Sequence, residues 1–513
     1  GWTPGEFANT HNVYLGVTFD DVNNATVTDP GGVLAGQGLA DATLDPGRLE
    51  FDQTYYWRVD EVNAAPDSTV FKGGVWSFTI EPFSIPVPDI TATASSSFGA
   101  SGPEKTVDGS GMTDDLHGTS AADMWISGGI PATIEYAFDR AYKLHELWIW
   151  NSNQLIEAFV GFGAKDVVIE YSLDGENWTV LEGVGPLARG AGTEGYAQNN
   201  TIDFGGAMAQ RVRLTINSVQ GIAPQASLSE IRFYFIPVNA REPQPADGGS
   251  AEAVNTTLRW RAGREAAEHE VVLSQDQAAV ADGSAGAVVL QESHYTPDPL
   301  LYSETYYWQV IETNAVSTPS RYEGPIWSFM APEYLTIDDF ETYADEPFLE
   351  IWDTWKDGFE DPGNGAIVGN GNEPERSIVA QGGKSMPIRY DNRTAPISAA
   401  TRTFDPALDW TVGAPTSLSL HIRGDAANDG QPMYVTVMDR SGRSATVFYK
   451  DGDPAATLSD VFEPWIIPLA DLAPVSLSSV ASVSVGVGTP GGAPSGAQGT
   501  AYVDLLRVGT PLP

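Results

Sequence analysis

The sequence contains no cysteine, few basic residues and no long apolar segment. Without a cysteine among its 513 residues, the chain has no disulfide, thiol nucleophile, thiolate zinc site or iron–sulfur cluster. Its 27 lysines and arginines stand against 68 aspartates and glutamates, and the resulting net charge of −41 repels phosphate backbones and anionic lipid. No apolar run reaches the roughly 18 residues of a membrane-spanning helix. We therefore expect no nucleic-acid binding and no membrane insertion.

Enzymatic motifs are also missing. Neither G-x-S-x-G nor H-E-x-x-H occurs, and the 6 histidines lie far apart. Residues 486–491 match G-x-G-x-x-G, but Gly-Ala-Pro follows them, and these residues do not open the helix that a dinucleotide site needs. We therefore expect no catalytic residue and no enzymatic activity.

An internal repeat is the clearest feature that the sequence does contain. Residues 54–64 (TYYWRVDEVNA) and 305–315 (TYYWQVIETNA) are identical at eight of eleven positions. The same spacing relates GGVWSF at 73–78 to GPIWSF at 324–329. Both copies alternate apolar and polar residues, and this alternation predicts β-strands.

The two copies resemble fibronectin type III-like modules of large extracellular bacterial proteins, through the TYYW strand and the closing WSF strand. Upstream, Trp2 and His11 match Trp260 and His269. A strand pattern at residues 253–259 (AVNTTLR) precedes Trp260 and has no counterpart in the first copy. We expect the first copy to leave a sheet edge open. The missing strand would come from upstream sequence, which we favour, or from another copy of the chain.

A different unit lies between the copies. The stretch DVVIEYSLDGENWTVL, followed by RVRLTI and then SLSEIRFYF, resembles a coagulation factor 5/8 type C (discoidin) domain. The resemblance implies a jelly roll and covers residues 89–236. The expected strands are residues 133–138, 144–150, 167–172, 211–216 and 231–235.

The last unit opens with TIDDFETY (336–343) and closes with AYVDLLRV (501–508). Four strand-like segments lie between them: SLSLHIRG, MYVTVMD, SATVFYK and FEPWIIPL. The acidic opening and the closing V-D-x-x-R strand resemble the galactose-binding-like jelly rolls found as carbohydrate-binding modules.

Together these units predict an all-β fold of four β-sandwich or jelly-roll domains in tandem. The 68 acidic residues offer many carboxylate pairs of the kind that glycoside hydrolases use, but four such domains leave no long segment for a catalytic domain. The expected domains are 1–84 (fibronectin type III-like, first strand missing), 85–237 (discoidin-like), 238–333 (fibronectin type III-like) and 334–513 (galactose-binding-like).

The discoidin resemblance implies one structural calcium site, closed by an early Asp-Gly loop and a late Ser-Glu pair. At the matching positions Asp108 and Glu230 offer carboxylates, and Lys105, Ser110 and Ser229 offer backbone carbonyls. Calcium takes six to eight such oxygens. The alternative is an ordinary Asp-Gly turn.

The jelly-roll resemblance implies a second structural calcium site. Its candidates are the carboxylates of Asp339, Glu341 and Asp504 and a carbonyl at Lys384. Three carboxylates brought together repel one another, so a divalent cation is a natural partner. The alternative is three solvated acids at strand ends.

Sugar binding requires exposed aromatic rings and planar amides, because rings stack on sugar C–H faces and amides bond hydroxyls. For each tryptophan that we consider, the alternative is packing in the core. The candidates are Asn151, Asn153 and Gln154 in the discoidin-like unit, and Trp352, Trp355 and Phe359 in the last unit.

These features predict a non-catalytic protein, extracellular or at the cell surface, that binds a polysaccharide or glycoconjugate. Two alternatives stay open. The chain could be a structural subunit of a surface fibre or layer, or the accessory binding region of a larger secreted polysaccharide-degrading enzyme. The first residues, GWTPG, are neither basic nor apolar enough for a signal peptide, so we expect a mature product or a piece of a longer protein.

Overall fold

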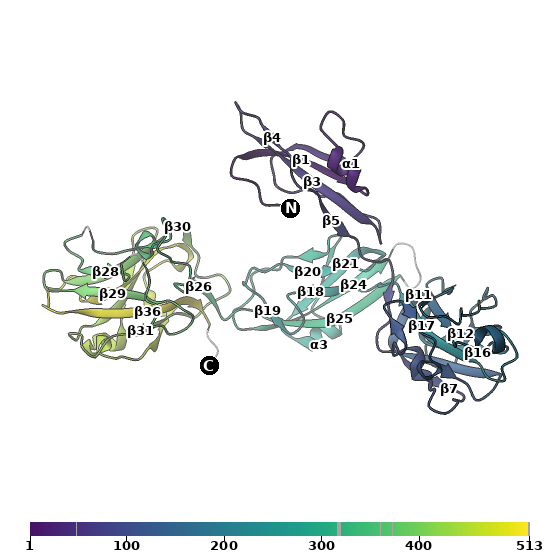
Figure 1. The fold of residues 1–513 in the computed structure, drawn as a ribbon. Helices are drawn as coiled ribbons and strands as arrows, with labels where there is room; N and C mark the ends of the chain where they lie inside the picture. Colours follow the sequence, from purple (N-terminus) through teal and green to yellow (C-terminus); the bar gives the residue numbers. More distant parts are fainter. Residues whose placement is uncertain (48, 315–319, 360, 372, 511–513) are drawn as a thin grey trace. The chain divides into compact units, whose positions relative to one another are not determined.

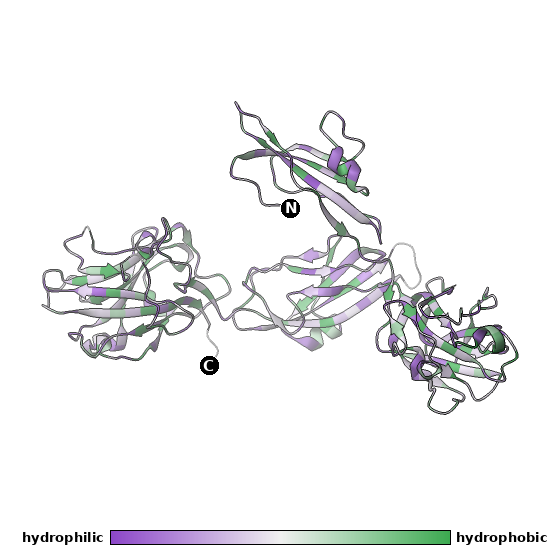
Figure 2. Cartoon of the chain, viewed as in Figure 1, coloured by the Kyte–Doolittle hydropathy of each residue, from purple (hydrophilic) through white to green (hydrophobic). Residues whose placement is uncertain are grey.

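The computed structural model describes residues 1–47, 49–314, 320–359, 361–371 and 373–510. These residues form mainly β-strands (Figure 1), and apolar and polar residues alternate along many of them (Figure 2). The all-β class is confirmed. The α-helices are short: α1 (Phe19–Asn24), α2 (Glu157–Val160), α3 (Gln277–Ala281) and α4 (Ile351–Thr354).

Contacts divide the chain into two compact units, residues 1–238 and 239–513. The four domain boundaries expected from the sequence stay a prediction. Within each unit the strands form separate sheets, which are described one at a time below.

The N-terminal strands form one five-stranded sheet in the order β2-β1-β3-β4, with β5 also paired to β3. The TYYW segment is β3, at the centre of this sheet. One small cluster of its core contains the buried residues Tyr14, Val22 and Ala25. The strands are β1 (Ala8–Gly16), β2 (Leu34–Leu39), β3 (Thr54–Asn63), β4 (Val70–Phe71) and β5 (Trp76–Thr79).

The next part of the first unit is a nine-stranded sheet built around β11 (Ala132–Asn151). The first half of β11 pairs with β7 and β16, and the second half pairs with β15 and β17. A register shift between Ala137 and Tyr142 marks the boundary between the halves. The two strands expected at 133–138 and 144–150 are nevertheless parts of one strand, β11. The other strands are β6 (Ile85–Pro86), β7 (Thr91–Ala94), β10 (Trp125–Ile126), β12 (Val167–Ser172), β13 (Thr179–Val180), β15 (Asn200–Asp203), β16 (Met208–Ile216) and β17 (Ser227–Phe235).

A large core fills this part, and loop strands flank it. Trp125, Tyr136 and Phe233 are among its fully buried rings. The loop strands form a small sheet in the order β14-β9-β8: β8 (Met112–Thr113), β9 (Leu116–His117) and β14 (Tyr196–Ala197).

The second unit begins with a sheet that repeats the first one. The order is β19-β25-β24-β21-β22, and Leu273 faces Trp308 as Leu15 faces Trp57 in the first copy. The repeat in the sequence is therefore a repeat of strand pairing. The strands are β18 (Arg241–Gln244), β19 (Gly249–Ser250), β20 (Leu258–Arg261), β21 (Ala266–Ser274), β22 (Ala287–Leu290), β23 (His294–Tyr295), β24 (Thr305–Asn314) and β25 (Arg321–Met330).

The second copy also has strands that the described part of the first copy lacks. β19 pairs in parallel with β25, and β18, β20 and β23 form a further sheet. The strand expected at 253–259 is wrong for most of its length, because residues 253–255 lie in a bend and turn and β20 starts only at Leu258. The strand on the β25 edge is β19 instead.

The last part of the chain is a sandwich of two sheets. One has the order β28-β29-β36-β31-β34, with β26 paired to β36, and the other has the order β27-β30-β35-β32-β33. Alternate residues of both sheets fill one core, which contains Trp355, Tyr390 and Trp410. The strands are β26 (Tyr334–Asp338), β27 (Trp355–Lys356), β28 (Ala366–Val368), β29 (Met386–Asp391), β30 (Ile397–Leu408), β31 (Ser417–Arg423), β32 (Met433–Asp439), β33 (Ser444–Phe448), β34 (Glu463–Pro468), β35 (Val480–Gly488) and β36 (Gln498–Gly509).

Candidate functional site

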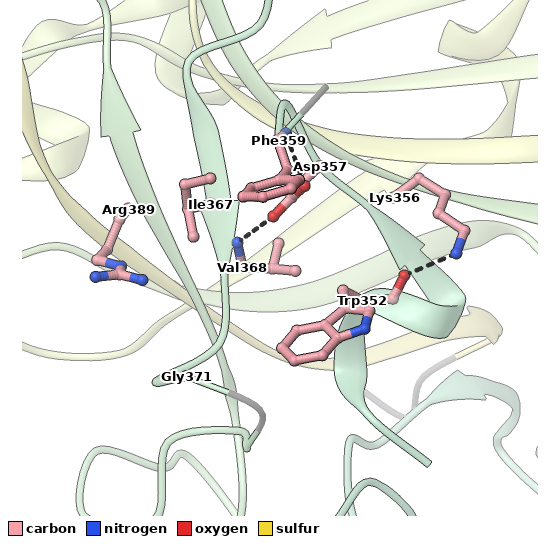
Figure 3. Close-up of a pocket in the computed structure, with 8 residues that line it drawn as sticks. All are labelled: Trp352, Lys356, Asp357, Phe359, Ile367, Val368, Gly371 and Arg389. Atoms are coloured by element: carbon pink, nitrogen blue, oxygen red, sulfur yellow. Dashed lines mark hydrogen bonds between the residues drawn. The ribbon is translucent and has the colours of Figure 1, made fainter. Parts of the chain in front are cut away.

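A cavity of about 720 Å³ opens on the C-terminal sandwich (Figure 3). Its volume lies in the range of small-molecule sites. Both sheets contribute to its wall, since Lys356 belongs to β27 and Ile367 and Arg389 belong to β28 and β29. The lining residues are Trp352, Lys356, Asp357, Phe359, Ile367, Val368, Gly371 and Arg389.

Hydrogen bonds hold the two sides of this cavity together. The Asp357 carboxylate accepts the backbone N–H groups of Phe359 and Val368, each at 3.0 Å, and so ties the loop after β27 to β28. The Lys356 ammonium donates to the backbone carbonyl of Trp352 at 3.0 Å, across the end of α4. Hydrogen bonds between side chains and the backbone therefore hold the cavity wall in place.

Two aromatic rings face the cavity. Phe359 is 81% exposed, and Trp352 is half-buried against the core. Phe359 and Ile367 also line an adjoining hollow of about 450 Å³, so the accessible space continues past the phenyl ring. Phe359 is therefore open to a ligand and Trp352 is partly accessible, and stacking of a sugar on either ring stays a prediction.

Trp355, the other tryptophan candidate, is part of the core. It is completely buried, and its indole N–H donates to the Asp338 carboxylate at 2.8 Å. The expectation that it is an exposed platform is wrong, because the β27 pleat turns it inward.

The amide candidates of the discoidin-like part are buried as well. Asn151 donates to the carbonyls of Ala164 and Ala188, at 2.7 and 2.8 Å. Asn153 accepts from the N–H of Gly192 at 2.7 Å and donates to loop carbonyls, and Gln154 is also buried. The expectation that these three amides lie on an exposed face is wrong, since Asn151 and Asn153 replace backbone partners inside loops.

Glu230 and Asp108, the carboxylates of the first expected calcium site, lie close enough to interact. Burial and the Asp108 charge raise the pKa of Glu230 to about 8, although Arg232 opposes the shift. Oε2 of Glu230 is buried and has no hydrogen-bond partner among the described residues. An unpaired buried carboxylate oxygen is costly, so this position suits a cation.

The Lys105 ammonium lies 3.8 Å from the Asp108 carboxylate, so this acid already has a cation beside it. Lys105 belongs to a short 3₁₀ turn, and its ammonium lies 3.3 Å from the Ser110 hydroxyl. Asp108 accepts the Ser110 N–H at 2.8 Å, as in an ordinary Asp-Gly turn. The Ser229 hydroxyl accepts the Asn153 N–H at 3.2 Å. Carboxylates such as Asp108 and Glu230 are ligands that calcium takes, and calcium binding here stays a prediction.

The second acidic cluster is already satisfied by the protein. Asp504 is buried and accepts the N–H groups of Ala380 and Leu505, each at 2.8 Å, while burial, with a contribution from the Glu341 charge, raises its pKa. Glu341 accepts the N–H of Lys384 at 3.0 Å, and the Lys384 ammonium donates to the Glu341 carbonyl at 2.7 Å.

Asp339, the third acid, accepts the Glu341 N–H at 3.2 Å. Within the described ranges, no three His, Cys, Asp or Glu side chains are grouped so that they could hold a metal. The expectation that Asp339, Glu341 and Asp504 group around one ion is therefore wrong. Whether calcium binds here stays a prediction.

Comparison with known proteins locates a family in the first unit. Residues 91–231 match the F5/8 type C domain model, which confirms the discoidin resemblance for this part of the chain. A comparison with curated proteins found no match.

Several solved structures are similar to part of the chain. CBM32-3 from a family 31 glycoside hydrolase of Clostridium perfringens is 28% identical, with 30% of this chain and 95% of that one covered and a TM-score of 0.24. The family 32 CBM from C. perfringens NanJ in complex with galactose is 19% identical over 30% of this chain and 98% of that one, with a TM-score of 0.23. A family 89 glycoside hydrolase from C. perfringens is 17% identical over 29% of this chain and only 14% of that one, with a TM-score of 0.21.

The helices of the described residues are all too short or too polar to cross a membrane.

Proposed function

We propose that the chain is a non-catalytic glycan-binding protein of the cell surface or extracellular space, and that the cavity beside Trp352 and Phe359 is one of its glycan sites. The observation that carries this proposal is the cavity itself. It combines two accessible rings with charged groups on a rigid sandwich edge, which is the pattern that sugar binding needs. The F5/8 type C match of residues 91–231 supports a binding role for the first unit.

A glycan array tests this function with the whole chain. Phe359→Ala and Trp352→Ala should each weaken binding by about tenfold, because a stacking ring is lost. Phe348→Ala is the matched control, since Phe348 is 91% exposed in the same sandwich but does not line the cavity. Binding that is unchanged in both cavity variants would remove the cavity from the proposal, and an array without any bound glycan would refute the function.

Calcium at Glu230 and Asp108 has a structural role in this proposal. The ion would join the Asp-Gly loop to the start of β17 through the unpaired Oε2 of Glu230. It would neutralise two like charges and would activate no water or substrate.

A second function, self-assembly by strand addition, is favoured by the exposed aromatic rings of β5 in the first repeat copy. Trp76 and Phe78 of β5 are 50% and 38% exposed, whereas Trp327 and Phe329, at the same positions of β25, are 5% and 1% exposed. Trp2, Leu15, Trp57 and Phe78 line an open hollow of about 370 Å³. A strand from another polypeptide, including another copy of this chain, would cover these rings.

A further inference from the structure

Arg389 stands at the cavity of Figure 3 as a cation without an acidic partner. It is exposed on β29, opposite Ile367 of β28. It makes no hydrogen bond or ion pair to any residue that the structure describes. By contrast, Arg393 pairs with Asp391 at 2.6 Å at the end of the same strand, and Arg402 pairs with Asp338. Arg440 likewise makes no side-chain ion pair to a described residue but lies outside the cavity, so what distinguishes Arg389 is its place in the cavity wall.

Lys356 adds a second positive charge to the cavity wall. Its ammonium uses one N–H for the Trp352 carbonyl, so two of its three donors remain available. The single acid of the lining, Asp357, is engaged by two backbone N–H groups. Beside the Trp352 indole N–H, the free side-chain donors of the wall therefore belong to these two cations.

We propose that this cavity recognises an anionic sugar unit, with a carboxylate or sulfate ester placed at Arg389 and the sugar ring against Phe359 or Trp352. The proposal rests on the glycan-binding function above and names its ligand class. A guanidinium offers two parallel N–H donors that match the oxygens of a carboxylate or sulfate, and such charged bonds are about twice as strong as neutral ones. A cationic cavity also counteracts the repulsion between an acidic chain and an acidic polymer at the place of contact.

The test compares anionic oligosaccharides with their neutral counterparts. The probes are oligogalacturonate, oligomannuronate and oligoglucuronate, each before and after carboxyl reduction, and a sulfated oligogalactan before and after desulfation. Calorimetric titration of the whole chain gives the affinities. We expect at least one anionic probe to bind at least tenfold more tightly than its neutral form, and to lose this advantage as salt rises.

The variant that tests the residue is Arg389→Ala, which should reduce the advantage of the anionic probe to less than twofold. Arg440→Ala is the matched control, because Arg440 is an exposed arginine of the same sandwich outside the cavity. Equal circular dichroism spectra and melting temperatures of the two variants exclude misfolding as the cause.

The outcomes separate this inference from the function on which it rests. If neutral and anionic forms bind equally and Phe359→Ala weakens both, the cavity binds sugar but the anionic preference is refuted. A preference that survives in Arg389→Ala refutes the assignment to this cavity. If no probe binds and the array is also empty, both the inference and the glycan-binding function fail. The carboxyl-reduced and desulfated arms show which anion is recognised.

Discussion

Arg58 is a completely buried charge in the N-terminal sheet. Its guanidinium donates to both oxygens of Asp60, at 2.8 and 3.0 Å, and to the carbonyls of Val22, Asn23 and Ala25. It also lies 4.2 Å from the centre of the Tyr14 ring. The small core of this sheet is therefore organised around one cation, which connects α1 and its end to β3.

Removing this cation should open the N-terminal sheet. Arg58→Ala leaves the buried Asp60 without its cation and with the Gly73 N–H as its remaining partner, which costs about 3 kcal/mol and speeds amide exchange of β1 and β3 about 100-fold. The repeat supplies the control: Gln309 and Ile311 occupy the equivalent positions, so the double variant Arg58→Gln, Asp60→Ile should exchange more slowly than Arg58→Ala. Hydrogen exchange with mass spectrometry measures both, and unchanged exchange in Arg58→Ala would contradict the role of this network.

Glu230 is the residue whose substitution tests calcium binding. Calcium at 100 times its dissociation constant adds about 2.7 kcal/mol, which raises a melting transition by several degrees. We expect calorimetry to show this rise when calcium replaces chelator, and to show none in Glu230→Gln. Glu182→Gln, an exposed acid in the same part of the chain, should keep the rise. Identical thermograms of the unmodified chain in calcium and chelator would refute the site.

At the residue scale, the sequence predicted residue types better than their exposure. Trp352 and Trp355 are three positions apart in one motif, yet one lines the cavity and the other is in the core. Asn151 and Asn153 were expected to bond sugar hydroxyls but bond loop carbonyls instead. Arg389 was missed, because its significance is its place in the cavity wall, and that place is set by tertiary contacts.

The two repeat copies differ at the edge of their closing strand, which is β5 in the first copy and β25 in the second. In the second copy, β19 pairs with β25, and Ala251, Val254 and Leu258 pack in the same core as Trp327. A synthetic peptide of residues 240–262 carries these groups. Added to the whole chain, it should slow the amide exchange of Trp76–Thr79 at least tenfold, because a new strand would protect β5.

The control peptide carries Val254→Asp and Leu258→Asp, and it should give no protection because a charge would enter the core. If neither peptide changes the exchange of β5, strand addition at this edge is refuted. Equal protection by both peptides would show that apolar pocket filling plays no part.

Strands with clear alternation were predicted closely. The expected strand at 167–172 is β12 (Val167–Ser172), and MYVTVMD is β32 (Met433–Asp439). The failure at 253–259 has a physical cause, since Val254 and Leu258 are both buried but Val254 lies in a turn and only Leu258 belongs to a strand. Alternation reports which side chains are buried, and it does not report whether the backbone pairs with another strand.

On the scale of the whole molecule, the sequence predicted the all-β class, and the four domains stay a prediction. The repeat and the strand periods are local signals, and they determine the fold class directly. The cavity of the C-terminal sandwich was not predictable, because Phe359 and Arg389 are 30 positions apart and line one cavity only in the folded sandwich.

Binding without turnover is what the whole chain should show. Each of several plant, algal and bacterial polysaccharides is placed in an affinity gel, the chain is run through it, and the polymer length is measured after prolonged incubation. We expect saturable retardation by at least one polysaccharide, most strongly by an acidic one, with the polymer length unchanged. Retardation by none of them, or shortening of the polymer that a single Asp or Glu substitution abolishes, would contradict a non-catalytic glycan-binding protein.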